Sequence, residues 1–427
     1  MGRWDLTALG VNQVIGGAIF LVPAQIAAEI GNWSPVGFVL AGLMMLLIAM
    51  CYAETGTRFN ETGGAYLYTR AAFGGFIGFL IGWMQWFVRV SSQAAIVSGI
   101  AGALAYYWRF ANRGWGQILV VSSITLLIGY WHTRGIRQSA WAINFFTIGK
   151  LAPLLIFITA GLVLSKWHWV SSLPTLSAKH TVTAGLLLAF AFGGFETIPV
   201  VSGEAKNPRR DLLFALTATI LFVTLIMSLT QAVYVATTHG IGPTSSTPLA
   251  DSAGAMLGWA GAAVMGAGAV ISMFGNNLGS SLTASRMLFA FSQNGDVPAV
   301  FGRVHSRYRT PVVAIWASTA VTLLLTVTGS FILLATVSAL ARLLTYTGVS
   351  LATLALRNPR FPRAAFLLPF GSAIPIAATA VSLAMLAGAT GTQLATGAIA
   401  LAAGAALYVC NAQIGRSKHA GAEKQAS

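Results

Sequence analysis

Apolar stretches of about 20 residues recur from one end of the chain to the other, with only short polar connections between them. Of the 427 residues, 8% are charged and 56% are hydrophobic, whereas roughly a quarter of a soluble domain is charged. So few charges cannot cover a surface that faces water. The sequence therefore predicts an all-α polytopic membrane protein, solvated by the lipid bilayer.

The boundaries of the apolar runs, marked by glycine, proline and charge, predict about twelve transmembrane helices. They lie near residues 6–29, 35–57, 74–107, 117–133, 140–164, 181–202, 211–237, 254–292, 312–328, 331–356, 365–388 and 393–411. An even number of spans places both termini on one side of the membrane. We expect one membrane domain over residues 1–427, without a soluble module.

The net charge of +15 could indicate a nucleic-acid partner, but the 25 Lys and Arg residues are scattered singly through loops. Membrane topology explains them better, because most fall on the side that carries the termini. The other side holds Arg109, Arg113, Lys166 and Lys179. The positive-inside rule then predicts a multi-pass protein of a bacterial-type inner (plasma) membrane, with both termini cytoplasmic and no nucleic acid bound.

The sequence offers no recognisable catalytic or metal-binding pattern. Cys51 and Cys410 fall inside apolar spans, and the six histidines lack metal-ligand spacing. An enzyme would need a nucleophile with a base, paired carboxylates or metal ligands at membrane depth. We therefore expect no metal, no cofactor and no catalytic residue, so the chain is not predicted to be an enzyme.

The first and sixth spans each contain a glycine pair in mid-membrane, at residues 16–17 and 193–194, followed by Pro23 and Pro199. Such a pair either permits close packing of helices or marks a break in the helix. Backbone groups freed by a break cost several kcal/mol each in hydrocarbon unless a partner satisfies them. Two breaks at related positions would therefore line a cavity that a polar ligand fills.

The second glycine pair lies five spans after the first, so the two broken helices run in opposite directions. This arrangement is typical of an inverted repeat of five plus five helices. The expected organisation is a first five-helix repeat over residues 6–164 and a second, inverted one over 181–356. Two additional helices over 365–411 and a cytoplasmic tail over 412–427 complete it.

The residues around both glycine pairs resemble a known family. Residues 15–20, Ile-Gly-Gly-Ala-Ile-Phe, are similar to the I-G-(S/A)-G-I-F signature in the first helix of the amino acid/polyamine/organocation transporters. Residues 190–196, Phe-Ala-Phe-Gly-Gly-Phe-Glu, and 203–208, Gly-Glu-Ala-Lys-Asn-Pro, resemble the sixth helix and the loop after it. Further similarity covers residues 52–54, 63–66, 285–286 and 294–298. One departure is Ala18, where the family usually has glycine.

This resemblance implies a fold like the bacterial leucine transporter and an amino acid carrier that works by alternating access. The substrate carboxylate would meet backbone N–H groups of Gly17, Ala18 and Ile19. Its ammonium would meet the carbonyls of Ile15, Phe190, Ala191 and Gly193, and Phe190 would act as an aromatic lid. The dipoles of half-helices favour the same arrangement. The candidate substrate-binding residues are Ile15, Gly16, Gly17, Ala18, Ile19, Phe190, Ala191, Gly193, Gly194, Asn276 and Asn277.

Lys150 lies inside the fifth predicted span, where a lone ammonium is so unfavourable energetically that it requires a function or a partner. It resembles the fifth-helix lysine of sodium-independent members, which occupies the place of a sodium ion and bridges the first and eighth helices. Burial disfavours the charged form of an amine, so Lys150 is the candidate for proton coupling. The alternatives are exchange without a proton gradient and a lysine that is permanently paired.

Four further charges lie at or near membrane depth. Arg89 and Arg342 each need a partner. Glu196 directly follows the second glycine pair, so we expect it to hold the unwound segment or to face a buried cation, either as a gating residue or in a static role. Glu54 is expected to pair with a basic residue near the cytoplasmic mouth.

The breaks have no spare acid beside them, which favours small or neutral amino acids as the substrate. A polyamine or cationic amino acid carrier or antiporter, and a non-transporting amino-acid sensor, are the alternatives. A channel is disfavoured because pores normally repeat rings of carbonyls or charge. The sequence does not determine the direction of net flux, symport versus exchange, or the oligomeric state.

Overall fold

The computed structural model describes residues 2–59, 63–105, 107–135, 140–165, 167, 175–201, 205, 207–237, 245 and 247–426. These residues form α-helices and short 3-10 turns, without a β-strand among them. The helices are α1 (Arg3–Val14), α2 (Ala18–Leu21), α3 (Pro23–Ile30), α4 (Ser34–Gly56), α5 (Ala65–Phe73), α6 (Gly75–Leu104), α7 (Gly114–Thr133), α8 (Ala140–Leu164), α9 (Ala178–Ala191), α10 (Thr197–Val200), α11 (Pro208–Thr237), α12 (Pro248–Gln293), α13 (Val312–Thr328), α14 (Phe331–Ala355), α15 (Ala373–Ala387) and α16 (Gly391–Ala426).

The helical membrane fold expected from the sequence is confirmed. Nine helical stretches of the described chain are long and apolar enough to cross a bilayer. Two shorter apolar helices, α13 and α15, and the interrupted pair α9 and α10 match three further predicted spans. The count of twelve and the inverted repeat stay predictions, because helix length and composition alone do not establish either.

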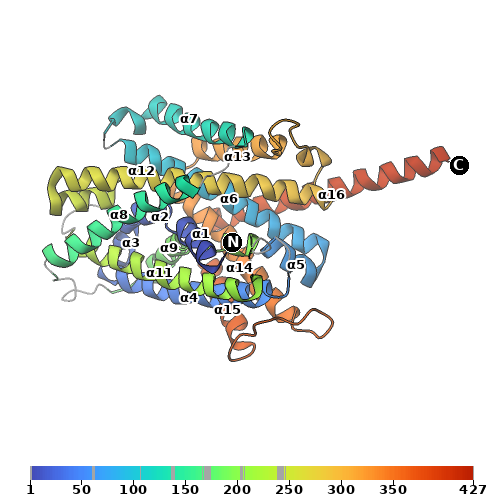
Figure 1. Cartoon of the computed structure of the whole chain (residues 1–427), viewed down its shortest axis with the longest axis horizontal. Helices are drawn as coiled ribbons and strands as arrows, with labels where there is room; N and C mark the ends of the chain where they lie inside the picture. Colours follow the sequence, from blue (N-terminus) through green and yellow to red (C-terminus); the bar gives the residue numbers. More distant parts are fainter. Residues whose placement is uncertain are drawn as a thin grey trace.

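Long helices surround shorter ones at the centre of the molecule. Helices α4, α6, α11 and α12 run along its long axis, and α1 and α14 lie among them (Figure 1). Helix α4 packs on α11, and α6 packs on both α12 and α14. The interrupted helices are thereby enclosed by helices that supply side chains to their open backbone.

Both predicted breaks are present in the structure. The first helix stops at Val14 and resumes at Ala18, and the second stops at Ala191 and resumes at Thr197. In the second break Gly194 has a φ of +131°, a region that residues with a Cβ rarely adopt. The glycine pairs therefore mark breaks and not only close packing.

Three parts of the fold differ from the expectation. Helix α5 was not predicted, because it is too short to read as a span. Helix α12 bends at Gly258, where φ is +68° and the helix is interrupted locally. Helix α16 continues as helix to Ala426, through the residues expected to form the tail, while its apolar stretch, Gly391–Gln413, agrees with the last predicted span at 393–411. Its C-terminal part extends away from the other helices (Figure 1).

Glu54, near the end of α4, holds two arginines from different parts of the chain. Its carboxylate lies 3.2 Å from Nη2 of Arg58 and 2.6 Å from Nη2 of Arg357, and it also accepts a hydrogen bond from the backbone N–H of Leu368. The expected pairing of Glu54 with a basic residue is confirmed. The hydrogen bond from Arg357 to Glu54 raises the pKa of Arg357 above its ordinary value.

Glu54→Gln is expected to lower the apparent melting temperature by about 3 °C or more, because a glutamine cannot neutralise two arginines. The side chain of Arg58 is only 4% exposed, so water cannot replace the lost carboxylate there. Glu29→Gln is the matched control, since Glu29 pairs with His180 at a more exposed position and should change little. Equal melting temperatures of the two variants would contradict this role of Glu54.

Candidate functional site

Side chains of α12 satisfy the backbone groups that the first break leaves open. The hydroxyl of Ser272 donates to the carbonyls of Gly16 at 3.0 Å and Ile15 at 3.4 Å. The amide of Asn276 donates to the carbonyl of Gln13 at 2.8 Å. A break inside the membrane is tolerated only with such partners, so α12 is part of the site.

Lys150 reaches the same break from α8. It is fully buried, and its Nζ donates to the carbonyls of Asn12 and Ile15, at 2.9 Å each. These carbonyls lie at the C-terminal end of α1, where the helix dipole favours a cation. The expected contact with the first helix is therefore present. The link to α12 is indirect, because Ser272 and Lys150 donate to the same carbonyl of Ile15.

The second break packs directly against the C-terminal end of α1, where the first break begins. A Cβ added to Gly194 would lie 2.6 Å from the carbonyl oxygen of Gln13 and 2.9 Å from the backbone nitrogen of Val14. Only a glycine allows the backbones to approach this closely. At Gly193, the guanidinium of Arg342 leaves no room for a Cβ.

Glu196 holds the second break to two neighbouring helices. Its Oε1 lies 2.7 Å from Nη1 of Arg342 on α14 and 3.4 Å from Nη2 of Arg89 on α6. Its Oε2 accepts hydrogen bonds from the backbone N–H of Gly194 at 2.8 Å and from the hydroxyl of Tyr346 at 3.3 Å. Both expected contacts of Glu196, with the unwound segment and with a buried cation, are confirmed. Its carboxylate is also the partner that Arg89 and Arg342 required.

The remaining candidate residues lie at or beside the breaks. Ala18 and Ile19 begin α2, and Ala191 ends α9. Phe190 is 3% exposed and meets the ring of Phe331 edge to face, with 6.0 Å between centroids. Their roles toward a substrate stay predictions.

The two asparagines of α12 differ. Asn276 bonds to the first break, whereas Asn277 donates to the carbonyl of Met273 in its own helix. The placement of Asn277 therefore gives it no direct hydrogen bond to either break among the described residues. Residues 203, 204 and 206 of the loop motif after the sixth span lie outside the described residues.

Sequence reasoning missed Ser272. The signal that could have found it is its spacing, since a residue four positions before Asn276 shares its helix face. Sequence reasoning also could not pair the buried arginines with Glu196, because no local sequence pattern shows that α6, α14 and the second break pack together.

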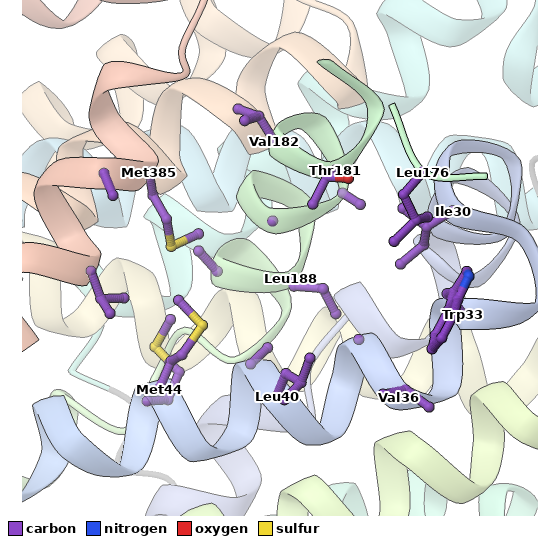
Figure 2. A pocket seen from close by; sticks show the side chains of 18 residues that line it. Ile30, Trp33, Val36, Leu40, Met44, Leu176, Thr181, Val182, Leu188 and Met385 are labelled. Carbon is purple, nitrogen blue, oxygen red and sulfur yellow. The ribbon is translucent and has the colours of Figure 1, made fainter. Parts of the chain in front are cut away.

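A large groove lies between α4, α9 and α15, and none of its lining residues belongs to either break. It has a volume of about 380 Å³, and its labelled side chains are almost all apolar, including Met44, Leu188 and Met385 (Figure 2). Several of these side chains, including Val36 and Leu40, are exposed on the outer surface. An apolar groove offers nothing to a zwitterion, so it is not the candidate site.

A helical membrane protein whose two interrupted helices meet in its interior belongs to the class of membrane transporters. The chain belongs to the amino acid permease family, which it matches over residues 1–417. It is therefore a multi-pass membrane protein with a general role in amino acid transport.

Curated relatives support this assignment. The chain is 30% identical over 395 residues to the branched-chain amino acid permease BcaP of Bacillus subtilis, covering 85% of this chain and 82% of the relative. It is 28% identical over 394 residues to the serine/threonine exchanger SteT of the same organism, covering 88% of each. It is 29% identical over 376 residues to human cationic amino acid transporter 4, covering 83% of this chain and 59% of the relative.

Proposed function

We propose that the protein is a secondary active transporter of small or neutral amino acids that works by alternating access. The observation that carries this proposal is the contact of the second break, at Gly194, with Gln13 and Val14, the last residues of α1 before the first break. A ligand held there touches both halves of the fold, so its arrival and departure can change how they pack.

The proposed substrate lies between the dipoles of the half-helices. Its carboxylate meets the backbone N–H groups of Gly17, Ala18 and Ile19. The carbonyl of Ile15 already accepts hydrogen bonds from Lys150 and Ser272 in this structure. The substrate ammonium is therefore expected to rely mainly on a carbonyl at the second break, such as that of Gly193.

The charge around the second break disfavours a cationic substrate. Two arginines and one glutamate lie there, so the local charge is positive. The three relatives described above are named for branched-chain amino acids, for serine and threonine, and for cationic amino acids. Among these classes the arginines favour the neutral amino acids over polyamines or lysine.

Lys150 is proposed to replace sodium. Its ammonium holds the end of α1 to α8, which is the task of a bound cation in sodium-coupled relatives of this fold. Transport is then sodium-independent and either proton-coupled or an exchange. The positive-inside pattern further supports a bacterial-type inner membrane with both termini cytoplasmic.

The test is counterflow of labelled amino acids into proteoliposomes loaded with unlabelled ones, with and without sodium. A transporter accumulates label from at least one neutral amino acid in sodium-free buffer. A non-transporting sensor on this fold would be stabilised by an amino acid in a melting assay and give no counterflow. An absolute requirement for sodium would contradict the role proposed for Lys150.

Lys150→Met is expected to reduce counterflow at least about 10-fold, because two buried carbonyls lose a charged donor while the side-chain volume stays similar. The control is Lys179→Met at an exposed lysine, which should keep full activity. Wild-type rates in Lys150→Met would show that the ammonium is dispensable for the transport cycle.

A further inference from the structure

The cluster of Arg89, Arg342 and Glu196 has an excess of positive charge. The three residues are 3%, 2% and 1% exposed, so water reaches none of them well. Two guanidinium groups face one carboxylate, and in the described chain neither arginine has an ion pair with a second acid. A buried charge without compensation is strongly unfavourable.

Several donors of this cluster have no partner. In the described part of the chain, Nε and Nη2 of Arg89 and Nε of Arg342 form no hydrogen bond, although Nη2 of Arg89 is within ion-pair distance of Glu196. The hydroxyl of Tyr52, whose ring packs on Tyr346, has no partner there either. Buried polar groups are nearly always satisfied, so unpaired guanidinium N–H groups point to a ligand.

The cluster lies at the second break. The guanidinium of Arg342 packs against Gly193, and Glu196 accepts the N–H of Gly194. A group that bound to the arginines would therefore lie next to the proposed substrate position. Guanidinium groups bind carboxylates and other small anions through charge-assisted hydrogen bonds.

We propose that Arg89 and Arg342 bind one small monovalent anionic group beside the second break. This group is either the side-chain carboxylate of an acidic amino acid substrate or a free anion such as chloride. The first source rests on the amino acid transport in the proposed function and would change the proposed substrate class from neutral to acidic. The second is independent of it and keeps a neutral substrate.

Arg89→Gln tests the proposal, because it removes the surplus cation and leaves the pair of Glu196 and Arg342 intact. The melting temperature of the purified full chain is measured in chloride and in isethionate, an anion too bulky for an enclosed cluster. It is measured separately with L-glutamate and with L-glutamine. For the anion that binds, we expect at least about 10-fold weaker binding to Arg89→Gln than to the wild type. Arg113→Gln, at an exposed arginine, is the charge-matched control and should bind as the wild type does.

Each outcome separates the sources. Stabilisation of the wild type by glutamate beyond glutamine, lost in Arg89→Gln, identifies the substrate carboxylate. Stabilisation by chloride beyond isethionate, lost in the same variant, identifies a free anion. No stabilisation of the wild type by either anion, or equal stabilisation of Arg89→Gln, overturns the proposal. The wild-type comparison needs no variant to fold, and counterflow of neutral amino acids decides the proposed function separately.

Discussion

Glu196→Gln is expected to destabilise the folded protein by about 3 to 5 kcal/mol and to abolish counterflow, because it leaves two buried arginines without their shared carboxylate. The same change weakens the hydrogen bond that fixes the N–H of Gly194. Glutamine has nearly the same shape as glutamate, so the effect is due to charge. The apparent melting temperature measures it.

A double variant distinguishes charge repulsion from a general packing defect. Removing Arg89 as well leaves a single cation, so Glu196→Gln with Arg89→Gln should melt at a higher temperature than Glu196→Gln alone. Additive losses would mean that the arginines do not repel each other across the cluster. Glu196→Asp keeps the charge and is expected to lose less stability than Glu196→Gln.

The sequence was sufficient for those parts of the fold that depend on local pattern. Apolar length predicted the helical membrane fold, and the limits of α13, Val312 and Thr328, coincide with the predicted ones. The glycine pairs predicted both breaks, and at Gly194 the φ of +131° and the nearby backbone of Gln13 and Val14 leave no place for a side chain. Helix α5 was missed because it is too short to read as a span. Its ion pair, with Arg70 2.6 Å from Asp296, joins residues far apart in the chain and has no local signal.

The site was predictable where a single charged residue would be strongly unfavourable in the membrane without a partner. A lysine in an apolar span requires carbonyls or an acid as partners, and Lys150 donates to two carbonyls at the end of α1. A glutamate after a break had to bind the break or a cation, and Glu196 does both. Which arginines it meets is set by how α6 and α14 pack, and that packing is not encoded in any local spacing.

Gly194→Ala is expected to cost at least about 3 kcal/mol and to stop transport, for two reasons that add. The φ of +131° strains any residue with a Cβ, and the added methyl group would collide with backbone atoms of Gln13 and Val14. Backbone cannot move aside as a flexible side chain can, so the two breaks would have to separate. A fall in melting temperature together with loss of counterflow is the expected measurement.

Gly185→Ala is the matched control, because it makes the same chemical change within α9. Gly185 is inside the helix, and a Cβ there would meet only the terminal methyl of Met385 at an ordinary 3.5 Å. Alanine should therefore stabilise the helix by about 0.5 to 1 kcal/mol and leave transport intact. If both variants behaved alike, the close approach of the breaks would not be a requirement of the folded state, and the proposed substrate position between them would lose its basis.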